Sequence, residues 1–287
     1  MKGSEFIEKM ISFKGNCLNY VEINKKSKKP KTILLIHGIS SNWRDWKTSL
    51  LSQIATLGYR TIVIDRPGMG QSIRDKAIIS LEDQSSLIIE IIQRLDVKSL
   101  IILGHSYGGS LSLQMAIKYP SYIQGLLLLG TPTHPWKGGL GLLYDILGFP
   151  LLTKIGTQVI SFLKPKRLIE TTLKDVFCPQ PVPYGYKEAL NINLTLRKRS
   201  LEWIIKDAKD LKSSLEKLSH SYSRLKVPVK IIHCLDDKIV PFSIHAKELH
   251  KKIPSSVLVK LERTGHMPHH FAKDIILSSL KSLLAES

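Results

Sequence analysis

Short runs of apolar residues alternate with stretches of helical periodicity in the first half of the chain. Continuous apolar runs are typical of strands that are covered on both faces. Four such runs occur, at residues 32–36, 61–65, 100–103 and 123–129. Apolar positions at helical spacing follow the first three of them, at residues 43–57, 81–95 and 111–119. This order predicts a parallel sheet whose strands are joined by right-handed helical crossovers.

The alternation stops after Gly130 and returns near Val229, and the segment between them is helical and loop-like without a buried-strand run. We therefore predict an α/β core of residues 1–132 and 226–287, interrupted by a helical insertion of residues 133–225. Beyond the insertion we expect two further strands and two helices, at 229–232, 243–253, 257–261 and 274–284. Before the first run, alternating residues predict a hairpin with strands at 10–13 and 18–23, joined at Gly15-Asn16.

The segment Gly104-His105-Ser106-Tyr107-Gly108 fits the pattern G-x-S-x-G and lies between a predicted strand and a predicted helix. In that position the pattern is typical of a sharp, strained turn that raises the serine hydroxyl above the sheet. Gly104 and Gly108 let the backbone pass close to itself, and the start of the helix favours negative charge beside Ser106. We therefore expect Ser106 to be a nucleophile.

A serine hydroxyl needs a base to take its proton, and the base needs an orienting carboxylate. Two loops late in the chain offer both, at Asp236-Asp237 and at Gly265-His266. Each follows the C-terminal end of a predicted strand, where open α/β sheets bind their ligands. The chain order Ser, Asp, His matches enzymes that have this kind of turn. We predict that His266 is the base and Asp237 the acid, with Asp236 as the alternative.

His269 and His270 lie nearer the final helix, where we expect a solvated or capping role. The spacing H-x-x-H-H of residues 266–270 also raises the alternative of a metal site. The sequence shows no matching carboxylate or cysteine set beside it, so we predict no metal. The three cysteines are widely spaced and form neither a disulfide framework nor a zinc-binding pattern. They are Cys17, Cys178 and Cys234.

An oxyanion on the substrate needs two hydrogen-bond donors. The backbone N–H of Tyr107 is one candidate, because it follows the nucleophile directly. The second should come from the loop after the first core strand, where Gly38 allows a close approach and Ile39 offers its N–H. We expect His37 to brace this loop through hydrogen bonds. Arg66, in the loop after the second core strand, is expected to form a surface or structural ion pair, with recognition of a substrate carboxylate as the alternative.

The formal net charge is +18, from 42 basic and 24 acidic residues. Such a charge permits contact with nucleic acid or with anionic lipid. Because the lysines are scattered along the whole chain, we interpret the charge as a bias of composition and predict no nucleic-acid partner. Residues 138–163 are mostly apolar, so peripheral contact with an anionic membrane stays open as an alternative.

No apolar signal-peptide segment is visible at the N-terminus. No apolar run reaches the ~18–20 residues that a membrane span needs. We therefore expect a cytoplasmic protein.

Taken together, these motifs resemble the α/β-hydrolase superfamily, in the branch that carries a helical cap. The matching segments are 37–38, 65–72, 104–109, 237–241 and 265–266. The resemblance implies an α/β-hydrolase fold with a mostly parallel, doubly covered sheet and a cap formed by the insertion. It also implies a triad of Ser106, Asp237 and His266 that works without a cofactor.

We expect hydrolysis of a carboxylic ester with a small or medium apolar acyl group, through an acyl-enzyme on Ser106. The same triad serves lysophospholipase- and monoacylglycerol-type lipid hydrolases and enzymes that cleave thioesters or carbon–carbon bonds, so these alternatives remain open. A non-catalytic binding protein is disfavoured, because no member of the triad is missing. The expected partner is a small acyl substrate, and the sequence does not specify an oligomeric state.

Overall fold

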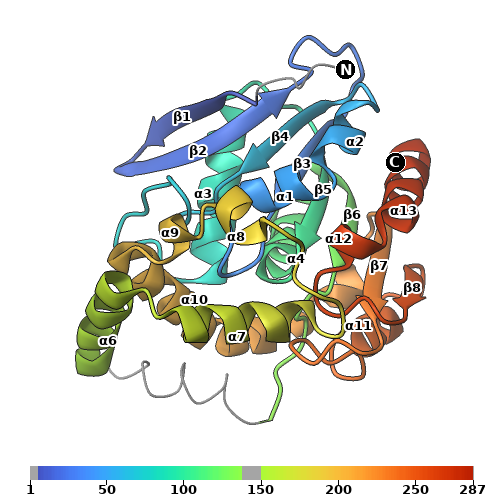
Figure 1. Ribbon diagram of the computed structural model, residues 1–287. Coiled ribbons are helices and arrows are strands. Elements are labelled where there is room, and N and C mark those ends of the chain that lie inside the picture. Colours follow the sequence, from blue (N-terminus) through green and yellow to red (C-terminus); the bar gives the residue numbers. More distant parts are fainter. Residues whose placement is uncertain (1–5, 138–149, 287) are drawn as a thin grey trace.

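The computed structural model describes residues 6–137 and 150–286. Within them an eight-stranded sheet has the order β1-β2-β4-β3-β5-β6-β7-β8 (Figure 1). Its strands are β1 (Glu8–Phe13), β2 (Asn16–Ile23), β3 (Thr32–Ile36), β4 (Arg60–Ile64), β5 (Leu100–His105), β6 (Ile123–Leu129), β7 (Val229–Cys234) and β8 (Val257–Leu261). β2 pairs antiparallel with β1 and with β4, and all other neighbours run parallel. The predicted, mostly parallel sheet is confirmed.

Helices cover both faces of the sheet. In β3, Leu34 and Ile36 pack into one apolar cluster with residues of α3, α4 and α11, while Ile33 and Leu35 pack into the other with α1, α2 and α13. The helices of the core are α1 (Arg44–Thr48), α2 (Leu51–Ala55), α3 (Leu81–Gln93), α4 (Tyr107–Lys118), α11 (Ala246–Lys252), α12 (Pro268–Phe271) and α13 (Lys273–Glu286). This burial on both sides explains why the strands are continuous apolar runs.

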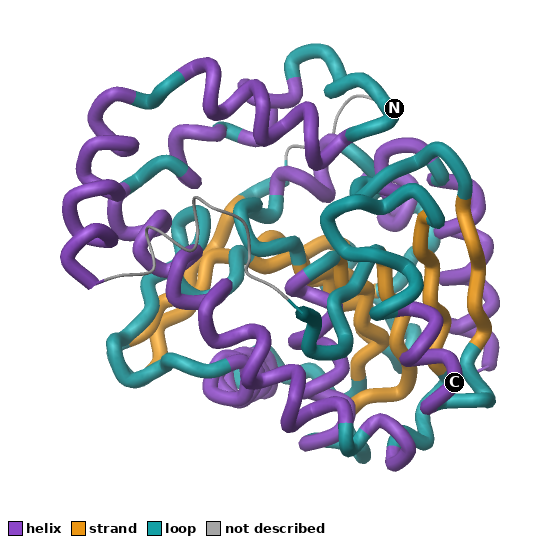
Figure 2. The backbone as a smooth tube through the Cα atoms, turned by 90° about the horizontal axis from the view of Figure 1, so that it is seen from below, coloured by secondary structure: helices purple, strands orange, loops and turns teal. Residues whose placement is uncertain are grey.

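Between β6 and β7 the chain leaves the sheet and forms helices, which we call the helical insertion. They are α6 (Pro150–Leu163), α7 (Lys166–Phe177), α8 (Tyr186–Leu190), α9 (Ile192–Thr195) and α10 (Lys198–Ser219), followed by the 3₁₀ helix η1 (Tyr222–Arg224). The insertion lies on one side of the sheet in two views (Figures 1 and 2). α10 packs against α3 and α6, and α8 packs against α1. Expectations for residues 138–149 lie outside the described residues.

Several element boundaries differ from the sequence predictions; β1, for example, begins at Glu8 rather than at residue 10. The hairpin turns at Lys14-Gly15 rather than at Gly15-Asn16, because Phe13 pairs directly with Asn16. The predicted helix 43–57 is two short helices, α1 and α2. The helix after Ser106 begins at Tyr107, four residues before the predicted start at Leu111. No helix in the described parts of the chain is long and apolar enough to cross a membrane.

Candidate active site

Ser106 occupies the sharp turn between β5 and α4. Its backbone has φ 51° and ψ −122°, a region that residues with a side chain rarely adopt. Its N–H donates to Leu129 O of β6 at 2.9 Å, and its C=O accepts from Gly109 N at 2.8 Å. These bonds join the turn to a neighbouring strand and to the first turn of α4. The surrounding structure thereby holds a conformation that is unfavourable by itself.

Glycine is required on both sides of Ser106 because the chain crosses itself there. A Cβ atom on Gly108 would lie 2.3 Å from the carbonyl oxygen of Ile36 in β3. A Cβ atom on Gly104 would lie 2.6 Å from the carbonyl oxygen of Gly108. Since both obstacles are backbone atoms, no side-chain rearrangement relieves them. The close packing of the turn therefore explains why the G-x-S-x-G pattern has glycine at both positions.

Ser106, His266 and Asp237 form one chain of hydrogen bonds. His266 Nε2 lies 3.0 Å from Ser106 Oγ, and His266 Nδ1 lies 2.8 Å from Asp237 Oδ2. All three residues are buried, and Ser106 is 8% exposed. With Asp237 as acceptor, the proton of neutral His266 sits on Nδ1, which leaves Nε2 free to accept from the serine hydroxyl. The three residues predicted from separate loops are thus brought together.

The environment of Asp237 favours its ionised form. Burial acts to raise the pKa of this carboxyl, but the electrostatic interaction and hydrogen bond with the His266 imidazole, together with the interaction with His233, outweigh burial and lower the pKa. Asp237 Oδ1 also accepts from the N–H groups of Ile239 and Val240, at 2.9 and 2.8 Å. Asp236, the alternative acid, points elsewhere, because its Oδ2 accepts from Arg263 N at 2.9 Å.

The two predicted oxyanion donors lie beside Ser106. Tyr107 is the first residue of α4. A Cβ atom on Gly38 would lie 3.4 Å from Ser106 Cβ, so the loop with Ile39 lies next to Ser106. Within the described residues, neither the Ile39 nor the Tyr107 N–H donates a hydrogen bond. Both amides therefore remain available to a ligand oxygen.

His37 stabilises the loop that contains Gly38 and Ile39 through hydrogen bonds. Its Nε2 accepts from Arg66 N at 2.9 Å, and its Nδ1 lies 2.8 Å from Gly38 O. Burial and the charge of Arg66 lower the pKa of His37 to about 3. The imidazole is therefore neutral at ordinary pH, as an acceptor at Nε2 must be.

Arg66 is fully buried and joins three parts of the structure. Its guanidinium donates to Ile39 O at 3.0 Å and lies over the Tyr107 ring, 4.2 Å from the ring centroid. It also forms an ion pair of 3.0 Å with Asp207 of α10. The expected structural ion pair exists, but inside the protein. The same side chain thus contacts both residues that are predicted to supply oxyanion donors.

Asp207 was not singled out by the sequence analysis. Its carboxylate forms a second ion pair, with Arg74 at 2.6 Å, and accepts a hydrogen bond from Gln84 Nε2 at 3.1 Å. Gln84 also donates to the Tyr107 hydroxyl at 2.8 Å. A signal was present, because Asp207 interrupts the apolar stripe of α10. That stripe consists of Trp203, Ile204, Ala208, Leu211, Leu215 and Leu218.

His105, the residue before Ser106, supports the loop of His266. Its Nε2 donates to the carbonyl oxygen of His266 at 2.8 Å, and the two rings lie 5.0 Å apart between centroids. Burial, together with the nearby histidines 269 and 266, holds the pKa of His105 well below its usual range. A neutral His105 with its proton on Nε2 is consistent with this contact.

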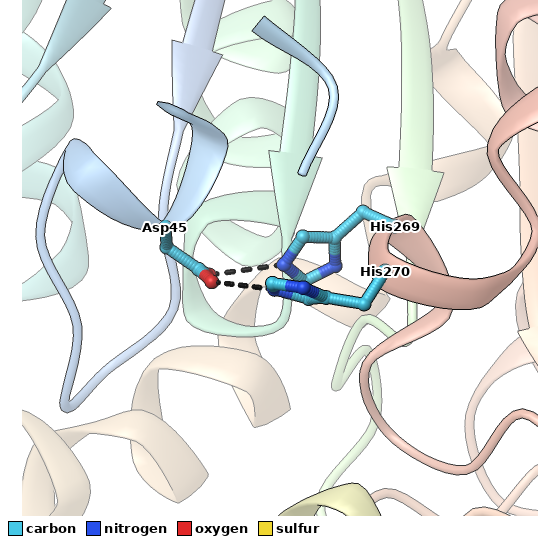
Figure 3. A group of neighbouring side chains, drawn as sticks. All are labelled: Asp45, His269 and His270. Carbon is cyan, nitrogen blue, oxygen red and sulfur yellow. Dashed lines mark hydrogen bonds and ion pairs between the residues drawn. The ribbon is translucent and has the colours of Figure 1, made fainter. Parts of the chain in front are cut away.

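His269 and His270 are not solvated, which corrects the sequence expectation. His269 is fully buried, and the two imidazoles approach the carboxylate of Asp45 from the same side (Figure 3). Each Nε2 lies 2.9 Å from an oxygen of Asp45. The Tyr186 hydroxyl of α8 donates to the same carboxylate at 3.0 Å. No local sequence pattern marks this cluster, because Asp45 lies 224 residues from His269.

This cluster supplies the carboxylate that the sequence did not place beside the histidines. One ligand atom from each of Asp45, His269 and His270 lies within 4.8 Å of the others, and such donors bind Zn²⁺ or Fe²⁺ in proteins. The carboxylate already accepts three hydrogen bonds, however, and His269 Nδ1 lacks the partner among the described residues that metal-bound histidines usually have. We interpret the cluster as a hydrogen-bonded junction between core and insertion, and the absence of a metal stays a prediction.

The family model of the alpha/beta hydrolase fold matches residues 31–273. The chain belongs to this family. Among curated proteins, this alpha/beta hydrolase is 26% identical over 247 residues to an uncharacterized hydrolase of Bacillus subtilis, YugF, with 83% of this chain and 84% of that protein covered. It is also 26% identical over 282 residues to Lipase 1 of Psychrobacter immobilis, with 96% and 83% covered.

Solved structures show the same alpha/beta hydrolase fold at lower identity. An esterase from Exiguobacterium antarcticum superimposes with a TM-score of 0.75 at 20% identity, covering 94% of this chain and 96% of that one. A 2-hydroxy-6-oxo-6-phenylhexa-2,4-dienoate hydrolase from Rhodococcus sp. strain RHA1 gives a TM-score of 0.75 at 19% identity, covering 98% and 99%. One neighbour is named as an esterase and the other as the hydrolase of a particular dienoate, so the shared fold does not specify the substrate.

Proposed function

We propose that this alpha/beta hydrolase cleaves carboxylic esters with a small or medium apolar acyl group, through a covalent intermediate on Ser106. The observation that carries the proposal is the chain of hydrogen bonds from Ser106 through His266 to Asp237, at 3.0 and 2.8 Å. A nucleophile, a neutral base and an ionised carboxylate in this order are what acyl transfer to serine requires.

In the first half of the reaction, Ser106 Oγ forms a bond to the acyl carbon and its proton passes to His266 Nε2. The carbonyl electron pair moves to the oxygen, where the N–H groups of Ile39 and Tyr107 stabilise the charge. Asp237 stabilises the imidazolium that has formed. The carbonyl then re-forms, the bond to the alcohol breaks, and His266 gives its proton to the departing alkoxide.

The second half repeats these steps with water. His266 takes a proton from the water as its oxygen attacks the acyl carbon, and the same two amides hold the oxyanion. When the tetrahedral intermediate collapses, Ser106 Oγ leaves and recovers its proton from His266. The carboxylic acid is released, and the enzyme returns to its starting state without a cofactor.

The test is turnover of p-nitrophenyl esters from acetate to palmitate by the wild type and by Ser106→Ala. We expect turnover by the wild type, with the preferred chain length indicating the size of the acyl pocket, and loss of nearly all turnover in the variant. Labelling by a fluorophosphonate should occur in the wild type and be absent in Ser106→Ala. Turnover that survives in Ser106→Ala would contradict the proposal.

The alternatives that share the triad have distinct results in this assay. Labelling of Ser106 without turnover of any p-nitrophenyl ester would contradict the ester proposal and favour a thioester or a carbon–carbon bond as the substrate. A preference restricted to the longest chains would favour a lipid hydrolase of the lysophospholipase or monoacylglycerol type. Absence of labelling together with absence of turnover would favour a binding protein.

A further inference from the structure

Helix α6 exposes large apolar side chains to solvent. Phe162 is 80% exposed, Leu163 64% and Ile155 54%. Leu152 and Val159 of the same helix are 42% and 46% exposed. We call these five residues the α6 apolar face. Single exposed apolar residues are ordinary on a protein surface, but several that are contiguous on one helix indicate a contact with something else.

The α6 apolar face is one continuous stripe. At 100° per residue, its members fall within about 100° of the helix circumference, and no charged residue lies among them. Thr157, on the other side of the helix, is buried and bonds to the Thr153 carbonyl oxygen at 2.6 Å. The helix therefore buries Thr157 and exposes an apolar stripe on its opposite side, whereas a helix that only covers a core buries its apolar stripe.

Positive charge adjoins the α6 apolar face. Lys164 follows its last residue directly, and Lys166 and Arg167 begin α7 one residue later. These three side chains, and that of Lys154 within α6, belong to exposed residues. α6 itself contains no acidic residue. An apolar stripe flanked by lysine and arginine is the pattern of a helix that lies in the surface of an anionic bilayer.

We propose that the α6 apolar face docks on the surface of a bilayer that contains anionic lipid. Phe162, Leu163 and Ile155 enter the boundary between headgroups and acyl chains, and Lys164, Lys166 and Arg167 contact the phosphates. A second copy of the chain fits the same face poorly, because each copy has a net charge of +18. α6 lies at the outer end of the insertion, away from the sheet (Figures 1 and 2), so a bilayer reaches it without meeting the core.

The apolar contribution is tested by co-sedimentation with vesicles of phosphatidylcholine alone and of phosphatidylcholine with phosphatidylglycerol. All proteins carry Ser106→Ala, so the result does not depend on the proposed hydrolysis. Binding to the anionic vesicles should weaken about tenfold or more in Ile155→Ser/Phe162→Ser. The matched control is Ile7→Ser/Ile79→Ser. It removes two surface isoleucines outside the helical insertion, which are 68% and 56% exposed. It should bind like the parent protein.

The electrostatic contribution is tested by Lys164→Gln/Lys166→Gln/Arg167→Gln. This variant should lose the preference for phosphatidylglycerol, and salt should weaken binding of the parent protein more than that of the variant. Its control is Lys25→Gln/Lys26→Gln/Lys28→Gln, which removes the same charge from the loop before β3, at the opposite edge of the sheet from Ser106. The control should keep the preference.

Three results would overturn the proposal. One is failure of the parent protein to sediment with either kind of vesicle. Another is equal weakening by the α6 variants and by their controls, which would show that composition rather than this face determines binding. The third is a stable dimer by light scattering that Ile155→Ser/Phe162→Ser converts to a monomer, because a second copy would then be the occupant of the α6 apolar face.

Discussion

Arg66 and Asp207 form an ion pair of 3.0 Å in which both side chains are completely buried. Arg66 belongs to the loop after β4, and Asp207 belongs to α10 of the helical insertion. Through Arg66, the insertion is joined to the carbonyl oxygen of Ile39 and to the ring of Tyr107. The packing of the insertion and the shape of the proposed oxyanion site are therefore physically linked.

Asp207→Asn should destabilise the protein and reduce turnover. The change leaves the charges of Arg66 and Arg74 buried without a counter-charge, which costs about 3–5 kcal/mol of unfolding free energy. We also expect kcat for a p-nitrophenyl ester to fall more than KM rises, because the loop of Ile39 loses its support. Urea unfolding and steady-state kinetics measure the two effects.

The control for this prediction is Asp210→Asn, one turn further along α10. Asp210 accepts from Leu81 N at 3.0 Å and from the Ser214 hydroxyl at 2.7 Å. An asparagine keeps an oxygen acceptor, so the loss should stay below about 1 kcal/mol. Equal losses of stability and of kcat in the two variants would show that the Arg66 pair has no special role.

Replacing Asp237 by asparagine should abolish most turnover, while the same change at Asp236 should not. The Asp237→Asn amide cannot stabilise the imidazolium of His266, and we expect kcat to fall by about 10³–10⁴-fold. Asp236 Oδ2 accepts from Arg263 N, and Asp236→Asn keeps an oxygen acceptor there. The measurement is kcat at pH 7, with circular dichroism to verify folding. An inactive Asp236→Asn beside an active Asp237→Asn would reverse the assignment of the acid.

The stability of the protein should decrease as the pH falls below about 6.5. Burial lowers the pKa of His37 and of His245 to about 3, whereas a histidine of the unfolded chain binds its proton near pH 6.5. Between these values the unfolded state binds more protons, so acid favours unfolding. Urea unfolding from pH 7.5 to 4.5 measures the slope. His245→Gln should make it shallower, and an unchanged slope would contradict the prediction.

The pKa shift of Asp65 changes stability with pH in the opposite direction to the shifts of His37 and His245. Burial raises the pKa of this carboxyl to about 6, so between the ordinary value near 3.9 and about 6 the folded state binds the extra proton. Its contribution to stability is present at low pH and is lost as the pH rises through about 6. In Asp65→Asn the decrease of stability from pH 6 to 4.5 should therefore be steeper than in the wild type.

Asp45→Asn should weaken the junction between core and insertion without any effect of metal. The variant replaces an ionised acceptor of three hydrogen bonds by a neutral one, and we expect a loss of about 2–3 kcal/mol. Thermal unfolding with and without EDTA tests the interpretation in both proteins. A wild-type melting temperature that falls with EDTA, together with one equivalent of metal by elemental analysis, would show that the cluster is a metal site.

Much of the fold could be predicted because burial on both faces leaves a clear pattern. β3 and β6 have the predicted bounds. The continuous helix predicted for 43–57 was wrong for a local reason. Ser49 Oγ donates to Asp45 O at 2.7 Å, and the backbone of Ser49 leaves the helical region. A serine hydroxyl that competes for backbone groups is invisible to hydrophobic periodicity.

The three triad residues could be predicted from the sequence, whereas the Arg66–Asp207 ion pair beside them could not. Ser106, Asp237 and His266 lie at strand ends, and a parallel sheet gathers such ends at one edge whatever the intervening sequence. Arg66 and Asp207 lie 141 residues apart on a loop and on a helix of the insertion. No repeat or turn specifies how that helix packs on the core. Such partners are determined by tertiary packing, which local sequence patterns do not encode.

The backbone conformation of Ser106 lowers the stability of the protein, while the hydroxyl that it positions serves the proposed activity. A residue with a side chain at φ 51° and ψ −122° is strained by about 1–3 kcal/mol, and glycine alone adopts this conformation without strain. Replacing Ser106, the proposed nucleophile, by glycine thus removes the strain together with the hydroxyl. A search for thermostable variants without a screen for activity would favour this substitution, and it would enrich proteins that fold well and no longer react.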